Sequence, residues 1–266
     1  REDREAGLRP FLICATAGST MTGSIDPLDA LADIAEAEDL WLHVDAAYGG
    51  FFMLTEYGRA AMQGISRAHS ITLDPHKSLF IPYGTGALLV RNGEHLRAAH
   101  RGQGDRYSPR QDDDERIDFC EHSPELSRAC RGLRVWLPLK VHGVNAFAES
   151  LQDKLNLAEW AAHHLSAQPN IDVPFAPSLT VVVFRHIETN LSADHLDEFN
   201  RRVVKRINDA GRIHLMGIQL NGRYYLRLCI LSYRTDRNAV ELALKEIKRG
   251  IVDVRASFEF ETAPVL

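Results

Sequence analysis

Residues 40–50 read LWLHVDAAYGG, and residues 70–78 read SITLDPHKS. Each stretch begins with a short apolar run, and each run ends at an aspartate, Asp45 in the first and Asp74 in the second. Short apolar runs that stop at charged and turn-forming residues are typical of buried strands. We therefore expect two strands, with Asp45 at the end of one and Lys77 just beyond the end of the other.

Strands and helices alternate around these two runs. The further elements expected here are a strand over residues 11–15, a helix that Asp26 caps and Pro27 begins, a short helix over residues 57–62 and a strand over residues 86–91. Such alternation is typical of an α/β layered sheet, in which ligands bind at the carboxyl ends of the strands. Thr16, Asp45 and Asp74 should therefore lie close together.

The second half of the chain has the pattern of a smaller α+β domain, and we divide the chain into residues 1–134 and 135–266. Asn221-Gly222, between two apolar runs, is the strongest short signal for a hairpin turn. The elements expected are a helix from Leu133 to Leu165 that Pro138 bends or breaks, a strand over residues 179–184, a helix over 194–210, a hairpin over 214–231, a helix from Thr235 or Asp236 to about Arg255, and a loose tail over 257–266.

Residues 101–118 differ in character from the rest of the chain. They are almost entirely polar and charged, and Tyr107 is the one large aromatic residue in the middle of the segment. Such a segment cannot bury enough apolar surface to form a core. We expect a mobile surface loop that carries Tyr107.

Composition narrows the class of protein. The chain has 266 residues, 45% of them hydrophobic, and a formal net charge of -5. Its basic residues are scattered and no apolar run could span a membrane, so we expect no nucleic-acid or membrane partner. The four cysteines include no CxxC pair, which favours thiols in a reducing, cytoplasmic setting and no metal site. The chain begins at Arg1, and we expect a fragment or a processed chain.

An amine and a carboxylate at neighbouring strand ends suit pyridoxal 5'-phosphate. The aldehyde of this cofactor bonds to a lysine amine, and an acid keeps its pyridine nitrogen protonated. Taken singly, Lys77 could be a surface lysine beside a turn, and Asp45 could cap a turn at the end of a strand. Together the two residues favour the cofactor site.

The two stretches resemble the HVDAA and PHK segments of the group II pyridoxal phosphate-dependent amino acid decarboxylases, the family of aromatic-L-amino-acid decarboxylase. The resemblance implies the PLP-dependent transferase fold type I (aspartate aminotransferase-like): part of the large domain, then a small C-terminal α+β domain. It also implies an internal aldimine at Lys77, Asp45 on the pyridinium nitrogen and Ala47 against the ring. Asp74 stands where asparagine is usual, and we expect a structural or indirect role for it.

Further site residues follow from the same resemblance. Residues 16–26, TAGSTMTGSID, are similar to the family's TxGTTxxGxxD stretch, which places Thr20 near the cofactor and makes Asp26 a supporting acid. His76 is expected to contact the cofactor or its phosphate and to take part in catalysis; the alternative is a histidine hydrogen-bonded within a turn. Tyr107 matches the tyrosine of the catalytic loop, which donates a proton.

The function expected is decarboxylation of an L-amino acid, aromatic by the resemblance, to the amine and CO2. The alternatives are an aldehyde synthase, an acidic amino acid decarboxylase, an aminotransferase or another lyase on the same scaffold, and an inactive assembly subunit. The resemblance covers only the later part of the family's length. The missing half holds the phosphate-binding loop and the histidine that stacks on the ring, so we expect that the chain has been cut or nicked, or that a companion chain supplies this half. The resemblance also implies a homodimer.

Overall fold

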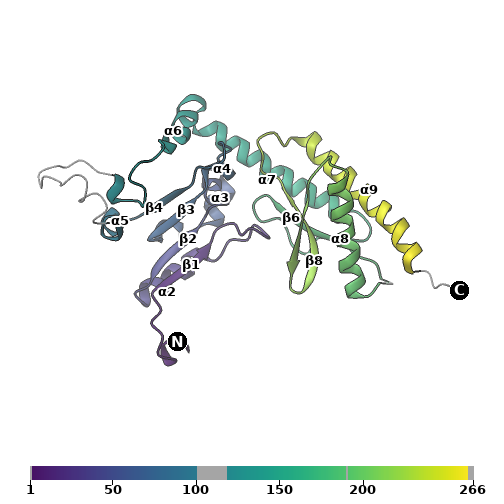
Figure 1. Cartoon of the computed structure of the whole chain (residues 1–266), viewed down its shortest axis with the longest axis horizontal. Helices are drawn as coiled ribbons and strands as arrows, with labels where there is room; N and C mark the ends of the chain where they lie inside the picture. The colour runs from purple at the N-terminus through teal and green to yellow at the C-terminus, as the bar shows by residue number, and fades with distance from the viewer. Residues whose placement is uncertain (1, 101–118, 190, 263–266) are drawn as a thin grey trace, which may run out of the picture.

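The computed structural model describes residues 2–100, 119–189 and 191–262, with side chains up to residue 258 (Figure 1). Two four-stranded sheets lie side by side along the long axis, and a long helix, α7 (Val144–Ser166), runs between them. Tyr107 lies outside the described residues. None of the helices described is long and apolar enough to cross a membrane.

The first sheet has the strand order β1-β2-β3-β4. Its strands are β1 (Leu12–Thr16), β2 (Trp41–Asp45), β3 (Ser70–Leu73) and β4 (Ala87–Val90), which confirms the expected strands. The first three are parallel, and β4 runs antiparallel to β3. Thr16 pairs with Asp45, and Asp45 with Thr72, so the carboxyl ends of three strands are aligned at one edge.

Short helices surround this sheet. They are α1 (Glu2–Glu5), α2 (Leu28–Ala37), α3 (Glu56–Ala61), α4 (Pro75–Ser78) and α5 (Gly93–His100), with 3-10 turns η1 (Gly50–Leu54), η2 (Ile65–Arg67) and η3 (Phe119–Glu121). The expectation that Asp26 caps α2 is wrong, since Pro27 occupies the cap position with no side-chain hydrogen bond. Asp26 instead accepts a hydrogen bond at 2.7 Å from the Thr16 backbone N–H, at the end of β1.

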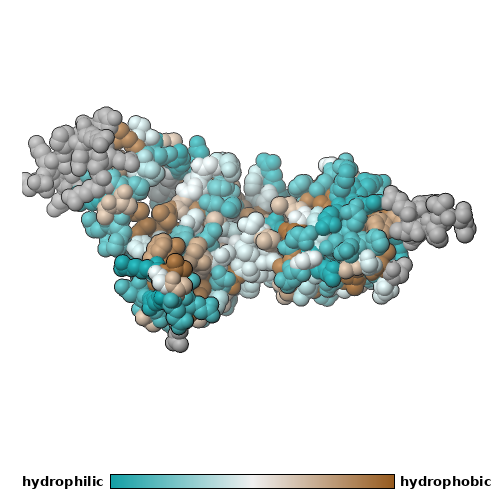
Figure 2. Space-filling view, turned by 60° about the horizontal axis from the view of Figure 1, so that its bottom comes forward, coloured by the Kyte–Doolittle hydropathy of each residue, from teal (hydrophilic) through white to brown (hydrophobic). Residues whose placement is uncertain are grey.

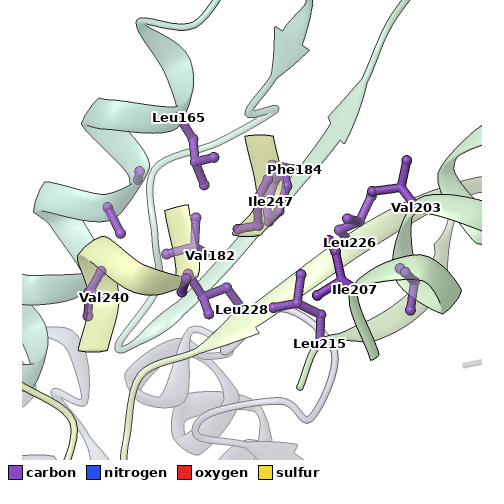
Figure 3. Packing of buried hydrophobic residues seen from close by; sticks show 14 of the residues in the cluster. Leu165, Val182, Phe184, Val203, Ile207, Leu215, Leu226, Leu228, Val240 and Ile247 are labelled. Atoms are coloured by element: carbon purple, nitrogen blue, oxygen red, sulfur yellow. The ribbon is translucent and has the colours of Figure 1, made fainter. Parts of the chain in front are cut away.

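The second sheet has the order β5-β6-β8-β7 and is antiparallel throughout. Its strands are β5 (Ile171–Asp172), β6 (Val181–His186), β7 (Met216–Leu220) and β8 (Arg223–Cys229); the helices on it are α7, α8 (Ala193–Asp209) and α9 (Arg237–Thr262). Figure 3 shows side chains of β6 and β8, such as Phe184 and Leu226, facing helical residues such as Ile247 and Val203. The hairpin at Asn221-Gly222 is confirmed, with both residues at positive φ.

Two expectations about helix ends are wrong. Pro138 lies inside α6 (Arg131–His142), so the break expected there is instead at Gly143, whose φ of 76° is accessible to glycine at little cost. A bend at Pro138 stays a prediction. The last helix does not stop near Arg255 but continues to Thr262, because its apolar face still has a core to cover there. Asp236 does cap it, accepting a hydrogen bond from the Ala239 N–H at 2.9 Å.

Helix α7 joins the two cores. Leu151 and Leu155 pack into the core beneath the first sheet, while Leu157 and Ala161 pack into the core of the second. The buried apolar face of α7 therefore packs against both sheets. The division expected at residue 134 falls inside α6 and stays a prediction.

Part of the surface around the first sheet is apolar. Figure 2 shows apolar surface over the half of the molecule that carries this sheet. Exposed residues there include Phe11 and Leu12 at the β1 edge and Leu88 and Leu89 in β4, and α6 has no buried residue. Apolar surface that gathers on one half of a molecule often marks a contact with another part of a protein.

Gly49 allows two loops to meet at the carboxyl edge of the first sheet. Its N–H donates to the Ala17 carbonyl oxygen at 3.1 Å, and a Cβ at position 49 would overlap that oxygen. Gly132, in α6, has nothing within 4 Å of the equivalent Cβ position.

The two glycines should therefore respond oppositely to alanine. We expect Gly49→Ala to lower the free energy of unfolding by about 1–3 kcal/mol through overpacking. Gly132→Ala should leave it unchanged or raise it by up to about 1 kcal/mol, since alanine favours the helix. Urea unfolding of both variants measures the difference, and equal midpoints would contradict the close approach described for Gly49.

Candidate active site

A pocket of about 430 Å³ lies at the carboxyl ends of β1 and β2. It brings together four residues that the sequence assigns to the site: Thr20, Asp45, Ala47 and Lys77. The complete lining is Thr16, Gly18, Ser19, Thr20, Met21, Thr22, Asp45, Ala47, Tyr48, Lys77 and Leu220. The aligned strand ends thus place an amine and a carboxylate at one cavity.

Lys77 projects from the short helix that follows β3. Pro75 occupies the first turn of this helix, where its missing N–H costs no hydrogen bond. The Lys77 Nζ lies 2.8 Å from Asp74 Oδ2, and the Lys77 side chain is 41% exposed. Asp74 thus contacts the amine directly, which is more than the indirect role expected from the sequence. The ion pair holds the amine at the strand end while leaving it accessible.

Asp45 faces the same pocket from the end of β2. Its Oδ1 accepts a hydrogen bond from the Ala47 N–H at 3.1 Å, and it has no salt-bridge partner among the residues that the structure describes. The Ala47 carbonyl oxygen accepts from the Asp74 N–H at 3.2 Å, which ties the two sequence motifs together through the backbone. One carboxylate oxygen of Asp45 therefore remains available to a cationic group in the pocket.

His76 lies beside the pocket rather than in its lining. Its Nδ1 donates to the Thr85 carbonyl oxygen at 2.6 Å, and its ring meets Tyr83 edge-on at 4.8 Å. Its Nε2 is 3.9 Å from Asp74 Oδ2. These contacts are those of a histidine that fixes the turn around Lys77, and a contact with the cofactor stays a prediction. Tyr107, the other catalytic residue expected, is outside the described part of the chain.

The loop after β1 forms one wall of the pocket. The Ser19 hydroxyl lies 2.8 Å from that of Thr22 and 2.9 Å from that of Ser24, so the hydroxyl side chains hold the loop in shape. Asp26 fixes the start of the loop through the Thr16 N–H. Thr20 lies at the pocket as the sequence predicts, within this internally bonded loop.

Two lining residues were missed by sequence reasoning. Tyr48 extends from the pocket to the second sheet, where its hydroxyl bonds to Thr180 Oγ1 and lies 3.5 Å from Cys229 Sγ. Burial, together with the nearby Cys229, raises the pKa of Tyr48 well above its usual value. Leu220 reaches the pocket from the hairpin tip. Its position before Asn221-Gly222 was visible in the sequence, but its distance from residue 45 was not.

Comparison with known proteins identifies the family. The model of the pyridoxal-dependent decarboxylase conserved domain matches residues 1–187. The chain belongs to this family. The family's description names the pyridoxal cofactor, which confirms the cofactor expected from the sequence.

Relatives within the family act on several amino acids. The chain is 38% identical over 260 residues to an aromatic-L-amino-acid decarboxylase of Bacillus atrophaeus, covering 97% of this chain and 54% of that protein. It is 31% identical over 250 residues to a histidine decarboxylase of Drosophila melanogaster, covering 93% of this chain and 28% of that protein. The chain therefore spans about half the length of the first of these relatives and less of the second.

Solved structures confirm the fold class. The Oryza sativa TDC structure with PLP and tryptamine superposes with a TM-score of 0.89 at 27% identity, over 95% of this chain and 52% of that chain. The structure of Catharanthus roseus tryptophan decarboxylase in complex with L-tryptophan superposes with a TM-score of 0.86 at 28% identity, over 95% of this chain and 53% of that chain. The α/β arrangement described above is thus that of the pyridoxal-dependent decarboxylases.

The pocket suits the cofactor in three respects. Lys77 offers an accessible amine, Asp45 offers a carboxylate with no ion-pair partner among the described residues, and Ala47 leaves room for a flat ring. The hydroxyl groups of the loop after β1 add neutral hydrogen-bond donors, and Lys77 is the one cationic side chain among the described residues of the lining. This part of the lining suits the aldehyde and the ring nitrogen of the cofactor better than it suits a phosphate.

The link between Tyr48 and the second sheet should contribute to stability. We expect Tyr48→Phe to lower the free energy of unfolding by about 1–3 kcal/mol, because buried Thr180 loses a hydrogen-bond partner. Tyr57→Phe, at a tyrosine that is 43% exposed, should change it by less than about 0.5 kcal/mol. Urea unfolding at neutral pH compares the two, and an equal effect would contradict the contact.

The stability of the parent protein and that of Tyr48→Phe should depend differently on pH. The folded state keeps Tyr48 protonated where the unfolded state ionises it, at pH values above about 10. Tyr48 therefore stabilises the fold up to that pH and loses this contribution above it, by at most about 1.4 kcal/mol per pH unit. The gap between the parent protein and Tyr48→Phe should narrow above pH 10; a constant gap would show that the tyrosine titrates normally.

Proposed function

We propose that the full-length protein decarboxylates an aromatic L-amino acid to the amine and CO2, with pyridoxal 5'-phosphate bound at Lys77. The observation that carries the proposal is that Lys77 and Asp45, from separate motifs, line one pocket. The family and its aromatic-amino-acid relatives support the reaction class. The apolar lining residues Met21 and Leu220 suit an aromatic substrate better than an acidic one.

Each pocket residue has a distinct task. When bound, the cofactor supplies an electron sink that stabilises the carbanion left by loss of CO2. Lys77 would hold the aldehyde end of the cofactor through Nζ, and Asp74 orients that amine from 2.8 Å. Asp45 holds a proton at the ring nitrogen through the carboxylate oxygen that Ala47 does not occupy. Ala47 offers a flat surface on one side of the ring.

The site requires more protein than this chain. Among the residues that the structure describes, the lining contains no cation besides Lys77, so we propose that the phosphate is held largely by other parts of the protein. The missing half of the family's length is the source that we propose. The exposed apolar residues of α6, such as Trp136 and Val141, support contact with another chain, which we propose to be a second copy in a homodimer. A companion chain that carries the missing half would meet the same surface.

Replacing the amine tests the first assignment. In the full-length protein, Lys77→Ala should abolish the visible absorbance of the bound cofactor, its fixation to the chain by borohydride, and turnover. Lys205→Ala, at an exposed lysine on α8, is the matched control and should change none of these. If borohydride still fixed the cofactor to the Lys77→Ala chain at another lysine, the assignment would be wrong.

Replacing the Asp45 carboxylate tests the role assigned to Asp45 at the ring nitrogen. Asp45→Asn should lower the chemical step by roughly 100-fold or more, because the ring nitrogen loses the charge that keeps it protonated. Cofactor occupancy should fall far less, since Lys77 still bonds the aldehyde. Absorbance titration and single-turnover rates separate the two effects, with Asp209→Asn on α8 as the control. Near-normal turnover would exclude the electron-sink role.

A second candidate function is oxidative. A relative from Rhodiola rosea, 27% identical over 241 residues, is a 4-hydroxyphenylacetaldehyde synthase. In that outcome the amino acid, O2 and water give aldehyde, CO2, ammonia and hydrogen peroxide. Tyr107, a proton donor by resemblance to the family, favours the amine.

The products of a Tyr107 variant distinguish the two outcomes. We expect Tyr107→Phe to shift the products from amine toward aldehyde and peroxide in the full-length protein, because the carbon that loses CO2 is protonated more slowly. Absorbance of the bound cofactor should stay unchanged. Product analysis by mass spectrometry measures the ratio, and amine as the sole product at the parent rate would remove Tyr107 from the mechanism.

A further inference from the structure

A second cavity lies in the C-terminal part of the molecule, away from the cofactor pocket. It is a groove of about 330 Å³ between the carboxyl end of α7, the turn before β5, the end of β6 and one face of α9. Small-molecule sites in proteins usually measure about 300–1,000 Å³. The groove is therefore large enough for a compact ligand, and it shares no residue with the pocket at Lys77.

The inner surface of the groove is apolar. Leu244, Ile247 and Ile251 recur at helical spacing on α9 and face Leu165 of α7 and Ile171 of β5 across the groove. Leu165 and Ile247 belong to the buried core, so the inner wall continues the packing of the second sheet. A ligand in contact with this wall needs a hydrocarbon body.

The outer edge of the groove is cationic. Lys245 and Lys248 lie on the exposed side of α9, and neither has a carboxylate partner among the described residues. Arg255 follows two turns later and pairs with Glu188 at 3.0 Å. The described residues that line the groove include no acid. Uncompensated positive charge beside an apolar wall is complementary to an anion with an apolar body.

A buried histidine adds a polar group to the same groove. His186 lines it, and its side chain is only 4% exposed. Its Nε2 donates to Glu188 Oε1 at 3.0 Å, while its Nδ1 is buried with no hydrogen-bond partner in the described part of the chain. Buried polar atoms are rarely left unpaired in native proteins. Because Nε2 carries the proton, Nδ1 is an acceptor that a carboxylate cannot satisfy, so His186 belongs to the inner wall of the groove and not to the place where an anion would bind.

We propose that this groove binds a monocarboxylate with an aliphatic or aryl-alkyl body. The body lies against Leu244, Ile251 and Val252, and the carboxylate meets Lys245 and Lys248. The proposal does not rest on the decarboxylase reaction, because the groove is built from other residues and its occupancy is measured by binding.

Calorimetric titration of the full-length protein with sodium octanoate tests the proposal. Octanoate should bind saturably with one site per chain, and its affinity should fall as the salt concentration rises. Octylamine has the same hydrocarbon body with a cationic head, and it should bind at least tenfold more weakly. Absence of octanoate binding, or equal affinity for octylamine, would overturn the proposal without altering the assignment of Lys77.

Variants of α9 locate the site. Lys248→Gln should weaken octanoate binding about threefold, and the double variant Lys245→Gln/Lys248→Gln about tenfold, as expected for exposed charge pairs. Arg249→Gln removes the same charge from the adjacent position, which does not line the groove, and should leave the affinity within measurement error. Equal losses for Lys248→Gln and Arg249→Gln would mean that the effect is long-range electrostatics and would refute the groove as the site.

A competing occupant is a segment of the longer protein. If octanoate bound to the 266-residue chain but not to the full-length protein, the groove would be filled intramolecularly, and the small-molecule proposal would fail. Binding to both with equal affinity would support it.

Discussion

Backbone hydrogen bonds between the parallel strands β1, β2 and β3 hold Thr16, Asp45 and Thr72 side by side at one edge of the first sheet. The location of the pocket follows from this register. A shift of one residue in β2 would turn the Asp45 side chain to the opposite face, because successive side chains in a strand alternate. The bond from the Asp74 N–H to the Ala47 carbonyl oxygen then places the turn that carries Lys77 against the turn that carries Asp45. An amine and a carboxylate can thus serve one cofactor although many residues separate them in the chain.

The pocket also depends on contacts between the two sheets. Gly49 lets the loop after β2 lie against Ala17, and the adjacent Tyr48 bonds to Thr180 on the second sheet. Leu220 completes the wall from the hairpin tip. Because α7 contributes to both cores, the second sheet cannot move far without disturbing the first. The second part of the chain therefore shapes the pocket as well as packing beside it.

Much of this arrangement could be predicted from local sequence. The strands into Asp45 and Asp74 and the hairpin at Asn221-Gly222 carry strong short-range signals, since apolar runs and turn residues act within a few positions. Capping by Asp26 was predicted wrongly because a carboxylate can satisfy either a helix end or a neighbouring strand end, and the choice depends on tertiary distance. Gly143, not Pro138, interrupts the long helix. The backbone stays helical through Pro138, whereas the φ of 76° at Gly143 ends the helix.

Pocket residues that lie in a short sequence motif could be predicted. Contacts between side chains that come together only in the folded chain could not. Lys77, Asp45, Ala47 and Thr20 were identified from motifs and line one pocket. The ion pair from Asp74 to Lys77 was not foreseen, because spacing alone does not say which way a side chain turns. Tyr48 and Leu220 became visible only through contacts made between the two sheets.

The proposed function depends on Lys77 and Asp45 contacting opposite ends of one cofactor. The most direct measurement is an experimental structure of the full-length protein with pyridoxal 5'-phosphate added. We predict continuous density from Lys77 Nζ to the aldehyde carbon, and an Asp45 carboxylate oxygen about 2.8 Å from the ring nitrogen. A cofactor bound to a different lysine, or a ring nitrogen that points away from Asp45, would contradict it.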